Sequence, residues 1–254
     1  RIYGNKDYLE MANHALDFMM NHFWDKEYSG LYWMVDYTGN VVNDRKQIYN
    51  IAFGIYGLTE YFRATGNKVS LDRAVELFRL IEKHSYDREN KGYIEACSRD
   101  WSPIEDMRLS PKEINCAKTM NTHLHILEAY TNLLRVWNTD EMKSVLKELI
   151  NVTLDHIVDL DTYHFKLFFD MEWNSFSRHV SYGHDIEGSW LLFEAAEVLG
   201  DKELIEKVRD ISIKMAESTY NEGVDNEFGG LLYESDGHVI IDSSKQWWPH
   251  AEAM

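Results

Sequence analysis

The chain has 254 residues, 44% of them hydrophobic and 27% charged, which is the balance of a soluble globular protein large enough for a sizeable core. With 26 Lys and Arg against 43 Asp and Glu, its net charge of −17 argues against unaided binding to nucleic acid or to an anionic membrane. No run of about 18 apolar residues predicts a membrane span, and nothing near Arg1 has the pattern of a signal peptide.

Apolar residues at helical spacing run along most of the chain. The first stripe contains Tyr8, Leu9, Leu16, Met19 and Phe23. The same spacing predicts further helices at about 46–64, 70–84, 118–137, 141–158, 184–199 and 202–220. Gly66 fits the C-cap of the helix that precedes it, and a Gly200-Asp201 turn separates the last two helices.

Short aromatic segments that alternate like strands lie between the helix pairs. They cover residues 30–36, 92–96, 165–170 and 230–234. A helix–helix–strand unit therefore recurs every 60–75 residues or so, which indicates a repeat architecture. Such hairpins either stack into an open solenoid or close into a ring.

A closed double ring of helices, the (α/α)6 toroid, needs six hairpins, and this chain has room for about four. The Trp-Trp-Pro start of a further helix close to Met254 also suggests a fragment. We therefore expect residues 1–254 to form one all-α domain. It should be an incomplete (α/α)6 toroid, truncated at both ends, with short β-hairpins between helix pairs.

Two of the predicted helices carry candidate site residues near their starts. Tyr49 and Phe53 are four apart on one helical face, where a buried aromatic stripe is the simpler interpretation. Asn121, His125 and Glu128 share a face of a later helix. This polar trio either points into a cavity or forms a polar helix edge with a satisfied histidine.

A third candidate site lies at Ser181–Trp190, where Gly183 can end a strand and His184 can open a helix. His184 and Glu187 are three apart, and a carboxylate beside an imidazole raises its basicity, as general acid/base catalysis requires. Helix capping is the alternative. It suits Asp185, but not His184, because a protonated imidazole is disfavoured at a helix N-terminus.

The adjacent Trp247 and Trp248 cannot both point inward from one element, so one is expected in the core and the other in a cavity, where it could stack on a sugar ring. Two core aromatics are the simpler alternative. A metal site is not expected, because the carboxylates are too few for a di-iron site and no HExxH is present. Cys97 and Cys116 have no CxxC spacing, which favours a reducing, cytoplasmic setting.

Four segments together resemble a known family. They are Lys-x-x-Tyr-x-x-Ala-Phe at 46–53, Asn-Thr-His-x-His-x-x-Glu-Ala at 121–129, Ser-Tyr-Gly-His-Asp-Ile-Glu-x-Ser-Trp-Leu-Leu at 181–192 and Trp-Trp-x-x-x-Glu-Ala at 247–253. In this order they resemble the N-acylglucosamine 2-epimerase superfamily, and most closely its cellobiose 2-epimerases. The resemblance covers essentially the whole chain. It implies an (α/α)6 barrel that inverts C2 of a reducing-end sugar through a cis-enediolate.

The resemblance also implies roles for individual residues. His184 is similar to one of two histidines that move the C2 proton, and His125 to the histidine that contacts O1 and O5 and helps to open the ring. Glu187 is similar to the carboxylate that supports the acid/base histidine. The implied substrate-binding residues are Tyr49, Phe53, Asn121 and Trp247. No metal and no dissociable cofactor is implied, and the only partner expected is a small sugar.

The sequence departs from the family pattern in three places. No residue before Tyr49 matches an arginine that faces the substrate, and no residue matches the second catalytic histidine, expected beyond Met254. We therefore expect this piece to be inactive by itself. Pro249-His250 stands where cellobiose 2-epimerases more often have Gln. An N-acyl-D-glucosamine 2-epimerase and a mannose or aldose–ketose isomerase therefore stay open, as do the oligomeric state and nucleotide regulation.

Two other classes compete with an epimerase. A glycoside hydrolase on the same barrel would need two catalytic carboxylates at a defined separation, whereas the polar motifs here centre on histidine. A non-catalytic glycan- or protein-binding module would be insensitive to substitution of His184.

Overall fold

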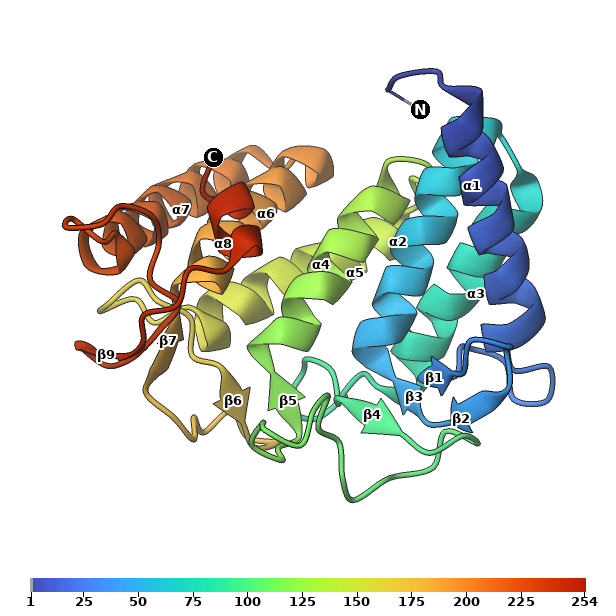
Figure 1. Ribbon diagram of the computed structural model, residues 1–254, viewed down its shortest axis with the longest axis horizontal. Helices are drawn as coiled ribbons and strands as arrows, with labels where there is room; N and C mark the ends of the chain where they lie inside the picture. The colour runs from blue at the N-terminus through green and yellow to red at the C-terminus, as the bar shows by residue number, and fades with distance from the viewer. Residues whose placement is uncertain (1) are drawn as a thin grey trace.

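The computed structural model describes residues 2–254 and confirms the predicted helix pairs (Figure 1). The helices are α1 (Lys6–Phe18), α2 (Ile48–Thr65), α3 (Lys68–His84), α4 (Met120–Leu134), α5 (Asp140–Val152), α6 (Tyr182–Leu199), α7 (Lys202–Gly223) and α8 (Trp247–Glu252). Helices α2, α4, α6 and α8 pack on one another in that order, and we call them the inner helices. Helices α3, α5 and α7 cover α2, α4 and α6 from outside, so the chain forms an arc of two helical layers.

The strands are shorter than predicted and lie closer to the helices. They are β1 (Met34–Val35), β2 (Val41–Asn43), β3 (Lys46–Gln47), β4 (Ala96–Cys97), β5 (Lys118–Thr119), β6 (Phe168–Phe169), β7 (His179–Ser181), β8 (Glu234–Asp236) and β9 (Val239–Asp242). Every pairing among them is antiparallel, and only β1–β2 and β8–β9 are hairpins. The prediction of short β-hairpins between helix pairs is confirmed for these two, and isolated antiparallel bridges such as Tyr86–Tyr93 and Val158–Phe165 close further loops between the pairs. The pairs β3–β4, β5–β6 and β7–β8 instead join the start of an inner helix to the segment after the next outer helix.

The predicted starts of two helices, at 46 and 118, are also corrected. Lys46 and Lys118 belong to β3 and β5, and the helices begin two residues later. The reason is a set of ladder and loop hydrogen bonds that hold the preceding residues extended, such as the bond from the Ile48 N–H to the Glu95 carbonyl (3.0 Å). The two predicted glycine C-caps are confirmed, since Gly66 and Gly200 both adopt the left-handed conformation. Helices α4 and α5 end earlier than predicted, at Leu134 and Val152.

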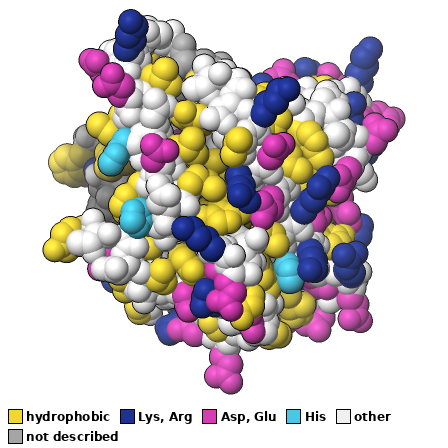
Figure 2. All heavy atoms as spheres, turned by 90° about the vertical axis from the view of Figure 1, so that its right-hand side faces the viewer, with side chains coloured by type: hydrophobic (Ala, Val, Ile, Leu, Met, Phe, Trp, Pro, Cys, Tyr) yellow, Lys and Arg dark blue, Asp and Glu magenta, His cyan; other side chains and the backbone are white. Residues whose placement is uncertain are grey.

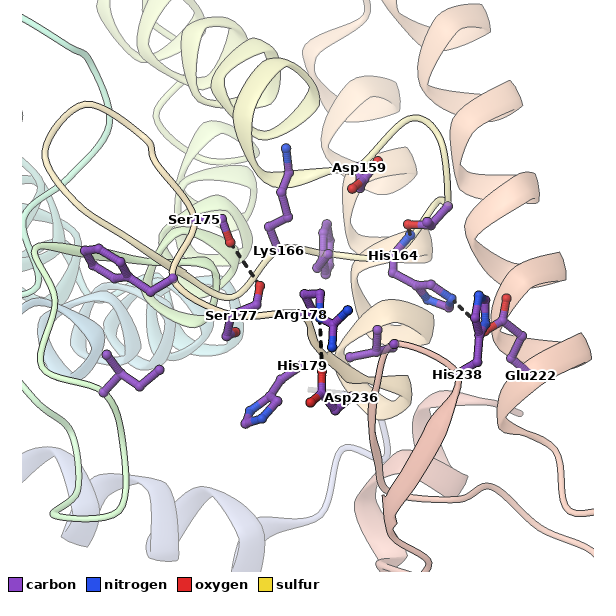
Figure 3. Close-up of a pocket in the computed structure, with 16 residues that line it drawn as sticks. Asp159, His164, Lys166, Ser175, Ser177, Arg178, His179, Glu222, Asp236 and His238 are labelled. Atoms are coloured by element: carbon purple, nitrogen blue, oxygen red, sulfur yellow. Dashed lines mark hydrogen bonds and ion pairs between the residues drawn. The ribbon is translucent and has the colours of Figure 1, made fainter.

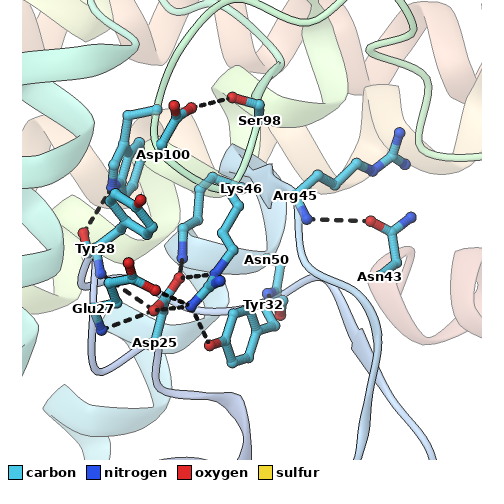
Figure 4. A network of polar contacts seen from close by, with 12 residues as sticks. Asp25, Glu27, Tyr28, Tyr32, Asn43, Arg45, Lys46, Asn50, Ser98 and Asp100 are labelled. Carbon is cyan, nitrogen blue, oxygen red and sulfur yellow. Dashed lines mark hydrogen bonds and ion pairs between the residues drawn. The ribbon is translucent and has the colours of Figure 1, made fainter.

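A lysine–aspartate pair recurs at the start of three inner helices, and we call it the lysine clip. The pairs are Lys46–Asp25 at 2.9 Å, Lys118–Asp87 at 2.8 Å and Lys245–Asp225 at 2.7 Å. Figure 4 shows the first pair, Lys46 and Asp25, within a wider network of polar contacts. Arg99 also donates a hydrogen bond to Asp25, at 3.0 Å. Burial alone would raise the pKa of Asp25, but hydrogen bonds from Arg99 and Lys46 outweigh it and hold that pKa below its ordinary value. Each clip fastens a loop aspartate to the segment that leads into an inner helix, which is a strand for Lys46 and Lys118.

The apolar stripe of α1 is only partly buried. Leu16, Met19 and Phe23 pack against the core, whereas Tyr8 and Leu9 are 62% and 41% exposed. Figure 2 shows this side of the molecule, with hydrophobic side chains visible among charged side chains of both signs. Among the described residues, no helix is both long and apolar enough to cross a membrane.

Helix α6 approaches the preceding loop so closely that Gly188 has no room for a side chain. A Cβ atom there would lie 2.1 Å from Cε2 of Phe165, which is itself 2% exposed. We expect Gly188→Ala to lower the free energy of unfolding by about 1–3 kcal/mol, because the core must shift to accept the extra methyl group. Chemical denaturation measures this loss.

Gly57 supplies the matched control, because it lies inside α2 with nothing within 4 Å of its Cβ position. Gly57→Ala should be neutral or stabilising by roughly 0.5–1 kcal/mol. An equal loss of stability in both variants would mean that helix α6 is not closely packed at Gly188.

Candidate active site

The first turns of the inner helices bring the candidate residues together. Helix α2 contributes Tyr49 and Phe53, α4 contributes Asn121 and His125, α6 contributes His184 and Glu187, and α8 contributes Trp248 and Glu252. Rings from neighbouring inner helices are in contact in two groups: Tyr49 and Phe53 of α2 lie 5.0 and 4.8 Å from His125 of α4, centroid to centroid, and Trp248 of α8 lies 4.9 Å from His184 of α6. Since the inner helices are neighbours in the arc, residues about 200 positions apart in sequence meet at one end of the bundle.

His125 is nearly buried and has one carboxylate partner. Its Nδ1 lies 3.1 Å from Oε2 of Glu128, one turn further along α4. Tyr49 meets its ring edge-on, and Phe53 lies against it at 40°. The helical spacing of Asn121, His125 and Glu128 thus produces the shared face that the sequence predicts, and the ion pair fixes the orientation of the imidazole.

His184 is held in a neutral state by its surroundings. Its Nδ1 lies 2.7 Å from Oγ of Ser181, and the Trp248 indole packs on its ring. Burial, and secondly the nearby charge of His125, lower the pKa of His184 to about 4. Helices α4 and α6, which carry the two imidazoles, pack against each other. At neutral pH His184 therefore has a free ring nitrogen that can take up a proton.

Glu187 does not pair with His184 in the way that the i, i+3 spacing predicts. The Nδ1 of His184 bonds to Ser181 instead, and the charge that favours ionised Glu187 comes from His125. Burial raises the pKa of Glu187 to about 7, helped by the negative charges of Glu252 and Glu128. Ser181 lies three residues before His184 and Glu187 lies three residues after it, so both side chains are near the imidazole. Only the Ser181 hydroxyl is within hydrogen-bond distance.

Two polar groups in the cluster are suited to bind hydroxyl groups. Oδ1 of Asn121 is buried and has no hydrogen-bond partner within the protein. Burial, and secondly the charge of Glu187, raise the pKa of Tyr49, so its hydroxyl keeps its proton. A buried amide oxygen without a partner costs about 1–3 kcal/mol, which a bound hydroxyl group could recover.

The two adjacent tryptophans differ in exposure, but neither of them lies in the hydrophobic core. Trp247 is 81% exposed, whereas Trp248 packs on His184 and lies 6.3 Å from Tyr233. Helix α8 begins at Trp247, and this start fixes which of the two indoles turns inward. The stacking role of Trp247 stays a prediction, and Trp248 is an additional aromatic wall beside the imidazole.

Three members of the cluster go beyond the sequence-based interpretation: Ser181 and Glu252, which have no role in it, and Glu128, which belongs to the predicted polar trio but is not predicted to bond to His125. Glu252 accepts a hydrogen bond from Nε1 of Trp190 at 3.0 Å and adds negative charge near Glu187. The sequence could have indicated each of these three residues, because all three lie within motifs that also contain a candidate residue.

Buried neutral histidines make the folded chain sensitive to acid. Burial lowers the pKa values of both His184 and His123 to about 4, against an ordinary value of 6.5. Between pH 6.5 and 4 these two side chains therefore bind protons in the unfolded chain but not in the folded one, so their contribution to the free energy of unfolding falls as the pH is lowered. Glu187 and Glu95, whose pKa values burial raises to about 7, contribute in the opposite direction.

NMR titration of the histidine rings tests this prediction, with His184→Asn and His123→Asn to assign the signals. Both rings should stay neutral down to about pH 4. A titration midpoint near 6.5 for His184 would contradict the closed environment described above.

The fold and the site together define a helical-toroid protein with imidazoles and carboxylates at the starts of its inner helices. The model of the N-acylglucosamine 2-epimerase (GlcNAc 2-epimerase) family matches residues 1–254. The chain belongs to this family.

Within the family, the chain is similar over its whole length to proteins named cellobiose 2-epimerase. A protein of Bacteroides fragilis named cellobiose 2-epimerase is 49% identical over 100% of this chain and 64% of its own length. The solved structure of cellobiose 2-epimerase from Bacillus thermoamylovorans B4167 is 40% identical with a TM-score of 0.91, over 98% of this chain and 63% of that one. The N-acylglucosamine 2-epimerase of Rattus norvegicus is 35% identical, but over only 30% of this chain and 19% of its own length. The chain thus spans less than two thirds of the relatives that it matches throughout.

Proposed function

We propose that the protein containing this chain is a sugar 2-epimerase that inverts C2 of a reducing-end aldose, converting cellobiose to glucosyl-mannose. The observation that carries the proposal is the placement of His125 beside Tyr49 and Phe53 and of His184 beside Trp248, on inner helices that pack against one another. The whole-length similarity to proteins named cellobiose 2-epimerase supports this substrate over an N-acylated amino sugar, for which the similarity is confined to 82 residues.

The chemistry asks for a base beside C2 and for stabilisation of the oxygen that becomes negative. The proton α to the aldehyde of the open-chain sugar is weakly acidic, so its removal needs a positioned neutral base. In our proposal His184 takes this proton and leaves a cis-enediolate. His125, oriented by Glu128, contacts O1 and O5 and helps to open the ring.

The remaining residues hold the sugar in this proposal. The free Oδ1 of Asn121 and the hydroxyl of Tyr49 bind sugar hydroxyls or an enediolate oxygen. Phe53 and the two tryptophans, Trp247 and Trp248, offer faces to the C–H surface of the sugar. Glu187 supports the acid/base group through its charge, which is coupled to His125.

Inversion also requires a proton donor on the opposite face of C2. The family resemblance assigns this role to a second histidine for which the chain has no match, and the chain spans about 64% of the relative from Bacteroides fragilis. We therefore propose that epimerisation needs the full-length protein and that this 254-residue chain alone is inactive. Epimer formation by the chain alone would overturn that part of the proposal.

Deuterium incorporation at C2 in D2O tests the function and the choice of substrate. The full-length protein is incubated in turn with cellobiose, mannose and N-acetylglucosamine, and the products are identified by NMR. Exchange with inversion on cellobiose supports the proposal. Exchange on N-acetylglucosamine alone, or formation of a ketose, assigns one of the other family activities. Bond cleavage without exchange would indicate a hydrolase.

A further inference from the structure

The inner helices are fastened to the preceding loops by a second device besides the lysine clip. In α4 and α8 a histidine of the first turn, His123 or His250, faces a backbone carbonyl one turn earlier with its Nδ1, at 2.6 Å in both cases. The Nδ1 atom must then carry the proton, and Nε2 is an acceptor. This Nε2 accepts the backbone N–H of Tyr93 (2.8 Å) or Leu231 (3.0 Å) from the loop.

The loop residue that precedes Tyr93 or Leu231 has to be glycine for the histidine to accept the N–H bond. A Cβ atom at Gly92 would lie 2.8 Å from Nε2 of His123, and one at Gly230 would lie 2.5 Å from Nε2 of His250. A histidine in the helix and a glycine in the loop are therefore a matched pair, and we call it the glycine–histidine fastening.

In the repeat that leads into α6, both members of the glycine–histidine fastening are replaced by other residues. His164 stands at the glycine position, five residues after Asp159 as Gly92 is after Asp87, and Asp185 stands at the histidine position. Oδ1 of the buried Asp185 accepts the N–H of Phe165 at 2.8 Å, as the histidines do elsewhere. Oδ2 lies 2.7 Å from Nδ1 of His164.

Because of this replacement, the fastening becomes a histidine–carboxylate pair, and it also reaches helix α7. Nε2 of His164 lies 3.4 Å from Oε2 of Glu222 on α7, and Nδ1 of His238 lies 3.6 Å from the same oxygen. Figure 3 shows the His164 ring pointing toward Glu222 and His238 at the edge of a cavity of about 740 Å³. Burial acts to lower the pKa of His164, but Asp185 and Glu222 outweigh it and raise that pKa above its ordinary value.

This repeat differs from the others in one further respect, because Val180 stands where the lysine of the clip is found elsewhere. Helices α4 and α8 each have both a lysine clip and a glycine–histidine fastening. Helix α6 has no lysine clip, so its start depends on Asp185 and His164. Asp185 lies between His184 and Glu187 in the same turn. Any movement of Asp185 carries both of these side chains with it.

We propose that Asp185 and His164 are positioning residues for His184, acting through the first turn of α6. The inference rests on the proposed function, in which His184 takes the C2 proton. Neither residue touches the sugar in this scheme. Their contribution is to hold a proton-accepting side chain within the narrow range of positions that proton transfer allows.

A double-variant cycle on the full-length protein tests the inference. His164→Gly leaves the buried Asp185 without its imidazole, and Asp185→His puts a second ring into the space that His164 fills. Each single variant is expected to lower kcat by about tenfold or more with KM changed less than about threefold, because the base is displaced while the sugar contacts remain. The double variant rebuilds the glycine–histidine fastening, and its kcat should return to within about threefold of the unaltered protein.

His238→Ala is the matched control, since His238 borders the same cavity but is 90% exposed and bonds to neither member of the pair. It should leave kcat unchanged. Single variants with unaltered kcat, or a double variant as impaired as the singles, would overturn the inference. So would losses of activity that only match the loss of folded protein measured by circular dichroism.

NMR of the His184 ring in the same proteins separates this inference from the proposed function. Its titration midpoint, about 4 in the structure, should rise toward 6.5 in the single variants and return in the double variant. If the unaltered protein exchanges no deuterium at C2, the proposed function fails, yet this readout still decides the positioning role. A midpoint that is the same in all four proteins would rule it out.

Discussion

His184→Asn in the full-length protein is expected to lower kcat for deuterium exchange at C2 of cellobiose by about 10²–10⁴-fold, the usual contribution of a general acid or base. Asparagine has nearly the polar reach of histidine but cannot take up a proton. KM should change little, because binding depends on Asn121, Tyr49 and the aromatic walls. Measurement of exchange and inversion in D2O gives both constants.

His238→Asn is the control for this prediction, since His238 is 90% exposed and its partner is Glu222 on α7 rather than a residue of the cluster. It should leave both constants unchanged. If His184→Asn keeps kcat within about threefold of the unaltered protein, His184 is not the base, and a binding module or a different acid/base group becomes the better interpretation.

Lys118→Met is expected to cost about 3–5 kcal/mol of unfolding free energy, the largest stability effect among the changes considered. The Lys118 ammonium is fully buried, and it bonds to Oδ2 of Asp87 and to the carbonyl oxygens of Lys91 and Met171, each at 2.8 Å. Removing it leaves a buried carboxylate and two carbonyl groups without their donor. Urea denaturation measures the difference.

Lys245→Met is the matched control, because Lys245 holds the same place in another clip but is 33% exposed. Its loss should cost no more than about 1 kcal/mol, as for other solvated ion pairs. Equal effects of the two substitutions would show that burial does not govern the strength of the clips.

The sequence predicts the helices and their pairing because apolar spacing and glycine caps are local signals. It predicts the shared face of Asn121, His125 and Glu128 for the same reason, since one helix fixes their separation. The strands are predicted less well: each is two to four residues long, and β3 to β8 are defined by partners across a helix pair rather than by their own alternation.

The details of the site depend on contacts that spacing cannot provide. Which of Trp247 and Trp248 faces His184 depends on the residue at which α8 begins. The partner of His184 is Ser181 rather than Glu187, because Ser181 lies at the end of β7 and its hydroxyl reaches back to the ring. In the repeat that leads into α6, His164 replaces the glycine and Asp185 replaces the histidine. This becomes apparent only when the repeats are compared in space.

The short sheets that join the ends of each helix pair also bear on how the chain folds. Gln47 pairs with Ala96 and Lys118 with Phe169, so each closure spans only 49 or 51 positions and encloses one complete pair of helices. Contacts between residues so near in sequence form quickly, because little chain entropy is lost in making them. A polypeptide with this connectivity can acquire its structure pair by pair as it leaves the ribosome, and each finished pair offers an apolar face to the next.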